Sequence, residues 1–459
     1  MPTTSRSRTK AFARGFLYYF VTGLILAIPA LMNQSPLVFS DSGAYIVSSF
    51  KLTAMTDRPM GYPLILRAVT WQASMWPMIF FQCTLASWLI QLVLRQLQPQ
   101  RTQLWRLHIP LLGILLLTSS LAWYTSQLMP DALSGFLGLL LFLVFFGKNL
   151  GTARLIFLWI CLFFVGLSHF GHMAVLIAIA GCLLLVRRLP GYKAVFGRRF
   201  WWNWTGLVAV LLGTMVFTRG YNQQQGHGWV MAPASDLFLA AKLCESGVMY
   251  EHLKRTCPDH DHPLCAHLDA FNTSAMFYIW DDTSPLKHPD GQIAASKSIA
   301  PLLHEVLCDP ANWGLIAWTT FTGTLIQLTQ VDIGAGLRDY REETAPWWPY
   351  QYELHHELPL YMNSHQQNAM WHFDTLNHIN FVVLPASLII MLLLWRNTSI
   401  RLRAFMVVAF AVVFFNAMAT AGLANIYDRL HARVTWLVVL AACLVLLEQY
   451  VGRRRTANG

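Results

Sequence analysis

The residues best suited to chemistry lie in a short polar stretch that follows the first apolar segment. Asp41 lies in FSDSGAY (39–45), and a second polar stretch, TDRPMGYP (56–63), follows it. A carboxylate beside a hydrophobic wall can serve as a base, because burial raises its pKa toward the working range. Asp41 is therefore the first candidate for a base that activates an incoming hydroxyl group. Alternatively, Ser40 or Asp41 caps a helix over 43–50, since Ser and Asp are favoured N-cap residues.

The second stretch has several interpretations. Asp57 and Arg58 could form an ion pair, Asp57 could cap a helix ahead of Pro59, or both could contact a substrate. The segment RPMGYP (58–63) is typical of a rigid turn that re-enters the membrane, because its prolines fix φ and Gly61 permits an unusual backbone. This structural role explains the motif, and a phosphate contact by Arg58 is a secondary interpretation.

Two further polar groups interrupt the apolar sequence. Asp131 follows Pro130, and many helices begin with a proline and an acid in the first turn. The Asp131 carboxylate could therefore serve only to stabilise the positive N-terminus of a helix. If Asp131 converges with Asp41, the two could hold a divalent metal or share a proton; the sequence assigns no cofactor.

His169 and His172 are three residues apart and would share one helix face. Without a third ligand, we interpret them as a polar lining of a donor pocket or a hydrogen-bonded pair rather than as a metal site.

The segment NIYDRLHAR (425–433) brings Tyr427 and two arginines to the start of the last apolar run. Arg429 and Arg433 are four residues apart, which places both guanidinium groups on one helix face and suits bidentate capture of a phosphate. An arginine near the membrane is costly without an anionic partner. Pairing with Asp428 or with lipid headgroups is the alternative.

Four of the eight cysteines fall in one polar region, and they are Cys244, Cys257, Cys265 and Cys308. Their spacing lacks the Cys-x-x-Cys pattern of zinc sites, so we expect them to form two disulfides in an oxidising compartment. Free thiols are the alternative.

Composition defines the class of protein. With 55% hydrophobic and only 12% charged residues, the chain is predicted to be an all-α integral membrane protein. The net charge of +10 does not indicate nucleic-acid binding, because the basic residues flank apolar segments. Ten segments could cross a bilayer, at approximately 14–32, 77–95, 107–124, 130–147, 155–171, 173–186, 204–218, 379–395, 404–422 and 432–450.

The distribution of charge predicts the topology. With both termini cytoplasmic, arginines and lysines gather on the inner side, and every Asp and Glu except Glu448 lies outside or at the outer border. The chain then divides into an N-terminal membrane module (1–218, with a first external loop at 33–76), an external α-rich domain or loop (219–378) and a C-terminal membrane module (379–459). If the apolar segment 313–328 crossed the membrane, the basic residues that follow it would lie on the outer side. We therefore expect this segment to be an amphipathic helix that lies on the membrane or packs in the domain.

The acid after the first span, the RPMGYP turn, the hydropathy layout and the Tyr-Asp-Arg element together resemble the polytopic GT-C glycosyltransferases. The resemblance implies a carboxylate in the first external loop, here Asp41, as the catalytic residue, and a second-loop carboxylate, here Asp131, in the floor of the site. It places Tyr427 and Arg429 near a lipid phosphate. It further implies inverting transfer of a sugar from a polyprenyl-phosphate donor to an envelope glycan, lipid or protein acceptor, at the outer face of a bacterial inner membrane.

Two other functions are alternatives to the glycosyltransferase. A non-catalytic transporter or assembly component for envelope polysaccharide would show repeated halves or helices broken at the membrane midplane. We find neither, and the polar residues gather at one face. A membrane acyltransferase would carry a catalytic histidine deep in the spans, whereas His169 and His172 lie near the face.

Overall fold

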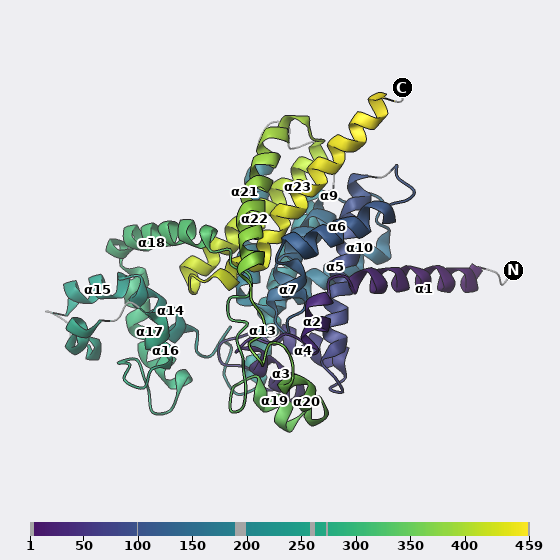
Figure 1. Cartoon of the computed structure of the whole chain (residues 1–459). Helices are drawn as coiled ribbons and strands as arrows, with labels where there is room; N and C mark the ends of the chain where they lie inside the picture. The colour runs from purple at the N-terminus through teal and green to yellow at the C-terminus, as the bar shows by residue number, and fades with distance from the viewer. Residues whose placement is uncertain (1–3, 99, 189–198, 258–261, 272–273, 458–459) are drawn as a thin grey trace.

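The computed structural model is built from helices (Figure 1). It describes residues 4–98, 100–188, 199–257, 262–271 and 274–457. Within these ranges there is no named β-strand, and extended pairing is limited to one isolated bridge between Leu37 and Gln127. The predicted all-α class is therefore confirmed.

Among the described residues, six helices are long and apolar enough to cross a membrane. They are α5 (Trp76–Leu97), α11 (Phe170–Arg188), α13 (Phe200–Gln224), α21 (Asp374–Leu394), α22 (Ile400–Leu423) and α23 (Asp428–Ala457). Shorter apolar helices are α6 (Trp105–Thr118), α9 (Phe136–Phe146) and α10 (Thr152–Ser168). This set of apolar helices is typical of a multi-pass membrane protein. The count of ten spans and the orientation of the termini stay predictions.

Four predicted spans are interrupted, and one of them is the fifth (155–171), which runs across the break between α10 and α11 at His169. The first comprises α1 (Thr4–Gly23) and α2 (Ile28–Asn33), the third comprises α6 and α7 (Leu121–Thr125), and the fourth comprises α8 (Asp131–Ser134) and α9. The breaks bring loops together: the Leu37 N–H donates to the Ser126 carbonyl at 3.0 Å, and the Leu128 N–H donates to the Leu37 carbonyl at 2.9 Å. This pairing joins the first loop to the connection between α7 and α8.

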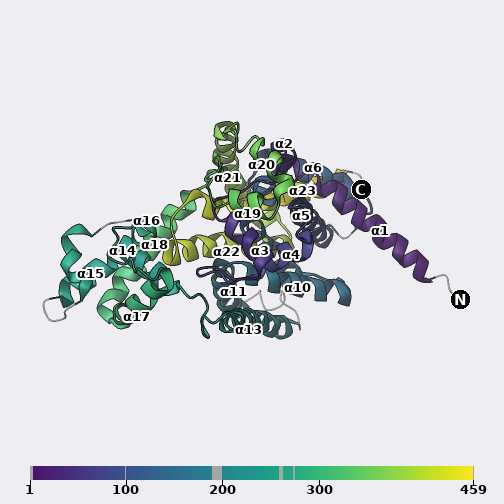
Figure 2. The ribbon, with the colours of Figure 1, turned by 90° about the horizontal axis from the view of Figure 1, so that it is seen from below.

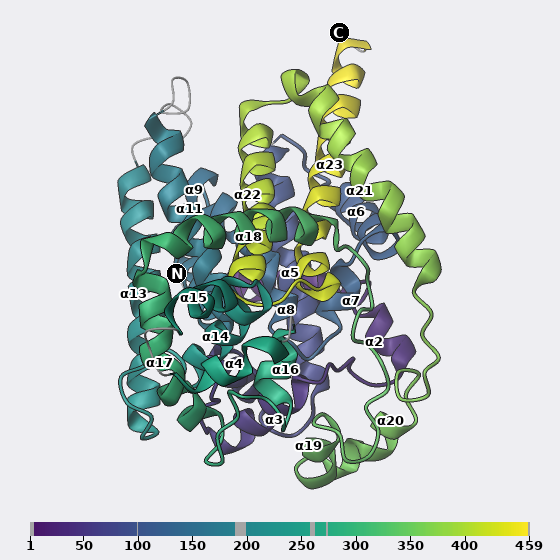
Figure 3. The ribbon, with the colours of Figure 1, turned by 90° about the vertical axis from the view of Figure 1, so that its left-hand side faces the viewer.

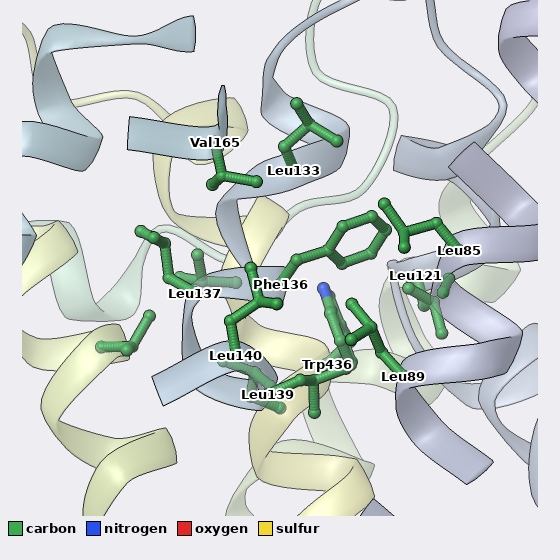
Figure 4. Packing of buried hydrophobic residues seen from close by; sticks show 14 of the residues in the cluster. Leu85, Leu89, Leu121, Leu133, Phe136, Leu137, Leu139, Leu140, Val165 and Trp436 are labelled. Atoms are coloured by element: carbon green, nitrogen blue, oxygen red, sulfur yellow. The ribbon is translucent and has the colours of Figure 1, made fainter. Parts of the chain in front are cut away.

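The main hydrophobic core fixes α23 against α8 and α9. Trp436 is buried among Phe136, Leu137 and neighbouring leucines (Figure 4). A Cβ at Gly135 would come within 2.4 Å of the Trp436 ring, so only glycine allows this approach. The Trp436 indole N–H donates to the Arg433 carbonyl at 3.1 Å. This packing sets the first turns of α23 against Asp131.

The region 219–378 is divided between two cores. A second core is formed by α14 (Ser235–Glu245), α15 (Val248–Thr256), η1 (Pro263–Ala270), α16 (Ala275–Trp280) and α17 (Gln292–Cys308). Figures 1 and 2 show this group set to one side of the bundle. In contrast, α19 (Trp347–Tyr352), η2 (His355–Glu357) and α20 (Leu358–Met362) return to the main core, beside α3 (Ser42–Lys51). The external location of 219–378 stays a prediction.

The apolar segment 313–328 is helical, within α18 (Pro310–Thr329). It lies across α22 (Figure 3). Cβ atoms at Gly323 and Gly422 would lie 3.3 Å from Ala421 and 3.1 Å from Thr320, so these two glycines let the helices approach closely. The outer face of α18 exposes large apolar side chains, including Trp318 and Phe321. The packing agrees with the predicted amphipathic helix, and its contact with the membrane stays a prediction.

The cysteine prediction is half correct. Cys257 and Cys265 form a disulfide, but Cys244 and Cys308 are free thiols. Cys244 is buried in the second core, whereas Cys308 is exposed at the end of α17 beside His304. A thiol inside a packed core cannot reach an exposed helix end without unfolding, so the second predicted disulfide is absent.

Alkylation of the native, unreduced protein should therefore label Cys308 and leave the other three cysteines of this group unlabelled. Within this group, denaturation without reduction should add only Cys244, because burial and not a covalent bond protects it. Peptide mass spectrometry reads each site. Labelling of Cys257 or Cys265 before reduction, or a linked Cys244–Cys308 peptide, would contradict the structure.

Candidate active site

Asp41 occupies the N-cap position of α3, but its side chain does not cap the helix, because its carboxylate makes no capping hydrogen bond to it. Instead, the Ser42 hydroxyl accepts a hydrogen bond from the Phe39 N–H at 2.8 Å. The side chain of Gln366 holds the preceding backbone, accepting from the Val38 N–H at 3.0 Å and donating to its carbonyl at 2.6 Å. Capping by the Asp41 side chain is therefore not observed. The Ser40 hydroxyl donates to Asp41 Oδ1 at 3.4 Å, and the carboxylate is directed to other partners.

The Asp41 carboxylate joins two arginines that are distant in sequence. Its Oδ1 lies 3.0 Å from Arg58 Nη2, and its Oδ2 lies 3.4 Å from Arg429 Nη1. The three side chains are 24%, 21% and 15% exposed, respectively. They form a partly accessible group, so an entering molecule can reach them. We call Asp41, Arg58, Arg429 and the groups that hold them the arginine–aspartate cluster.

Arg58 also pairs with Asp57, whose Oδ2 is 3.1 Å from Arg58 Nε, and it lies over the Tyr45 ring at 5.5 Å. Burial opposes the charge of Arg58, but Tyr45, Asp41 and Asp57 outweigh it and raise the arginine's pKa. Burial raises the pKa of Asp57 despite the neighbouring cation. Of the interpretations of Asp57 and Arg58, the structure shows the ion pair.

The turn before α4 (Gly61–Thr70) differs from expectation in one respect. Gly61 does not adopt a positive φ; it is the first residue of α4. Its role is close approach, because a Cβ there would lie 2.4 Å from the Leu167 carbonyl at the end of α10. Arg67 then ties α4 to α3, donating to the carbonyls of Ser49 and Phe50 at 2.9 Å each. These contacts fix Arg58 relative to Asp41.

The buried part of the cluster centres on Asp131. Its Oδ1 lies 2.5 Å from Arg433 Nη1, and its Oδ2 lies 3.8 Å from Arg429 Nε. Oδ2 is buried and makes no hydrogen bond. Arg433 is fully buried, and its guanidinium also donates to the Asn416 side-chain oxygen at 2.9 Å. The predicted common face of Arg429 and Arg433 is confirmed, because both reach Asp131.

Arg429 connects the exposed and buried parts. It lies between the carboxylates of Asp41 and Asp131, and its guanidinium stacks on the Phe39 ring at 3.6 Å. The Tyr124 hydroxyl donates to the Arg429 carbonyl at 2.9 Å and fixes the backbone of this turn. Asp41 and Asp131 thus converge through one arginine, as the metal or shared-proton hypothesis required, but a guanidinium occupies the space between them.

The two histidines do not share a helix face, which corrects the prediction. α10 ends at Ser168 and α11 begins at Phe170, so His169 lies in extended backbone between the helices. His172 uses both ring nitrogens: Nδ1 bonds the Val165 carbonyl at 2.7 Å, and Nε2 lies 2.8 Å from the Ser134 hydroxyl. His172 is therefore a hydrogen-bonded residue of the helix interface.

Within the described ranges, no three His, Cys, Asp or Glu side chains gather as metal ligands.

Tyr427 has a side chain that is 47% exposed. Its backbone is held by Gln327 of α18, which donates to the Tyr427 carbonyl at 2.8 Å and accepts from its N–H at 3.1 Å. Thus α18 steadies the turn that carries Arg429.

Sequence reasoning missed three residues of this arrangement. Asn416 is an amide residue within the apolar run of α22, a signal typical of function or of a buried partner. Gln327 lies on the buried face of α18 with Asn312, Gly323 and Thr324, opposite the exposed apolar side chains. Phe39 was part of the first motif, but nothing in its sequence context indicated that it would stack on an arginine.

The cluster combines chemistry of two kinds. A partly exposed carboxylate can accept a proton, and two partly exposed guanidinium groups can bind an anion such as phosphate. Comparison of the chain with protein-family models, with curated proteins and with solved structures found no match.

Proposed function

We propose that this protein is a GT-C-like membrane glycosyltransferase, which moves a sugar from a polyprenyl-phosphate donor to an envelope glycan, lipid or protein acceptor. One observation carries the proposal: Asp41 of the first loop lies against Arg429 at the start of the last apolar helix, 388 residues away in sequence. A candidate base and a candidate phosphate ligand therefore meet at one end of the helical bundle.

In the proposed reaction, the acceptor hydroxyl attacks the anomeric carbon and gives its proton to Asp41. The bond from that carbon to the phosphate oxygen breaks, and its electron pair leaves with the polyprenyl phosphate. Arg429 and Arg58 stabilise the negative charge that develops on this leaving group. Attack from the face opposite the phosphate inverts the anomeric configuration.

The pairing in the cluster also supports an order of events. Both arginines bind Asp41. A donor phosphate competes with that carboxylate for the same N–H groups, so its arrival frees oxygen lone pairs on Asp41. Asp131 and Arg433 are mainly buried. We assign them to holding Arg429 in place, so Arg433 is a positioning residue and not a phosphate contact.

Arg429→Ala should weaken binding of a polyprenyl-phosphate sugar by roughly tenfold or more, because a charge-assisted hydrogen bond contributes about 1.5–3 kcal/mol. Titration of a fluorescent donor into protein in nanodiscs measures the dissociation constant. Lys51→Ala is the control, since Lys51 is an exposed cation on the neighbouring helix α3. Equal donor affinity in wild type and Arg429→Ala would remove the phosphate role.

A further inference from the structure

A second basic site lies at the opposite end of α5 from the arginine–aspartate cluster. Gln82, near the start of α5, faces the cluster side through hydrogen bonds to Tyr62 and to the Gln127 carbonyl. Arg95 is in the last turn of the same helix, thirteen residues on, or about 20 Å at 1.5 Å per residue. The two sites are therefore separate.

At this end, α1, α5, the loop that follows α5 and the start of α6 line an open groove of about 390 Å³. Its basic side chains are Arg95 and Arg101, and Thr102 adds a hydroxyl group. Trp105, at the start of α6, forms part of the wall and is half exposed. The groove thus combines two cations, a hydroxyl group and an aromatic ring at the end of a membrane-length helix.

The groove is held by a set of hydrogen bonds rather than formed by loose surface residues. His108 Nε2 lies 3.0 Å from the Ser87 carbonyl and donates to it, so Nδ1 accepts from the Tyr18 hydroxyl at 2.8 Å. Tyr19 donates to the Gln91 side chain, and Thr22 bonds Ser87 at 2.7 Å. α1 is therefore fixed along α5, and Tyr18 and Gln91 form a firm floor.

The two arginines lack a counterion. Arg95 and Arg101 are each partly buried, yet neither forms an ion pair with an Asp or Glu of the described residues. Partly desolvated guanidinium groups at a membrane border are costly without an anion. The groove therefore supplies the charge and the donors for an anion that the described part of the chain does not provide.

The surroundings indicate which anion fits. Trp105 and Ile109 are one turn apart on α6, and both are exposed. Phe16 and Leu17 on α1 are exposed as well. An apolar surface beside a basic groove suits a molecule with a phosphate head and acyl chains, and basic pockets between membrane helices bind anionic lipid headgroups.

We propose that Arg95 and Arg101 bind the headgroup phosphate of an anionic membrane lipid, with the acyl chains lying along α1 and α6. The site does not depend on the proposed glycosyltransferase reaction. Its ligand is a lipid of the surrounding bilayer and not the sugar donor.

The test adds short-chain phosphatidylglycerol to the purified full chain in a neutral detergent and measures binding through the shift in melting temperature. Phosphatidylcholine and inorganic phosphate are the comparison ligands. We expect only phosphatidylglycerol to raise the melting temperature of the wild type. Arg95→Gln/Arg101→Gln should weaken its apparent affinity about 30-fold, taking about 1 kcal/mol per arginine and about 1.4 kcal/mol per tenfold change.

Arg188→Gln/Arg396→Gln is the matched control, because it removes two exposed arginines elsewhere on the chain. The control should retain wild-type affinity, and Arg95→Lys/Arg101→Lys should retain most of it, since charge is kept. An equal loss in the control would show that net charge, not the groove, attracts the lipid. An equal shift with inorganic phosphate would replace the lipid with a free anion, and unchanged affinity in Arg95→Gln/Arg101→Gln would overturn the proposal.

Discussion

Arg433→Met is expected to cost about 3–5 kcal/mol of stability, the usual effect of removing one partner of a buried ion pair. Methionine fills much of the space, but it leaves the Asp131 carboxylate buried with Arg429 alone, 3.8 Å away. The Asn416 side chain also loses its guanidinium partner. The change thus leaves two buried polar groups poorly satisfied.

The double variant Arg433→Met/Asp131→Leu should recover a large part of this loss, because no buried carboxylate remains and apolar replacement of a buried pair is often close to neutral. Thermal unfolding in detergent measures the three proteins, with Arg188→Met as the control for loss of an exposed arginine. A single variant as stable as wild type would contradict the buried pair. A double variant no more stable than the single one would show that Asp131 and Arg433 are not coupled.

Asp41→Asn is expected to reduce sugar transfer by roughly 10²-fold or more, because the amide cannot accept the proton of the acceptor hydroxyl. Donor binding should survive. The substitution removes a carboxylate that competes with the donor phosphate for Arg58 and Arg429, so the affinity should stay equal or increase. Folding should also survive, since the Asp41 side chain caps no helix.

Separate assays of donor affinity and single-turnover rate distinguish this role from a structural one. Asp57→Asn is a useful comparison, because it removes another carboxylate bound to Arg58. It should leave the rate within a few-fold of wild type, since Asp57 does not contact Arg429 in the cluster. A loss of rate in Asp57→Asn as large as in Asp41→Asn would mean that charge near Arg58, not a specific base, controls the reaction.

Much of the helical framework could be predicted, because the backbone N–H and C=O groups of a long apolar run find no water in the membrane and must hydrogen-bond to one another within a helix. All ten predicted segments are helical over most of their length. The breaks were not predictable from hydropathy: Ser119 and Ser120 end α6, and His169 separates two helices, inside runs that read as continuous. Apolar composition reports burial in the membrane and says little about where a helix turns.

The cluster was predicted in part, for an identifiable reason. Arg429 and Arg433 share a face through helix periodicity, a local property that sequence spacing expresses directly. Convergence of Asp41 with Asp131 was raised as a hypothesis, but the contacts through Arg429 that join them span hundreds of residues, which spacing does not encode. The second predicted disulfide failed for the same reason, because spacing does not show that Cys244 is buried while Cys308 is exposed.

Release of polyprenyl phosphate from a polyprenyl-phosphate sugar by the purified wild-type protein tests the central proposal most directly. Single-turnover mixing with a panel of radiolabelled donors, with water or added glycans as acceptors, would be followed by separation of the lipid products. We expect polyprenyl phosphate to appear in step with a sugar product of inverted configuration, roughly 10²-fold more slowly in Asp41→Asn. Transfer by Asp41→Asn at the wild-type rate, or no release by folded wild-type protein that binds a donor of the panel, would contradict the proposal.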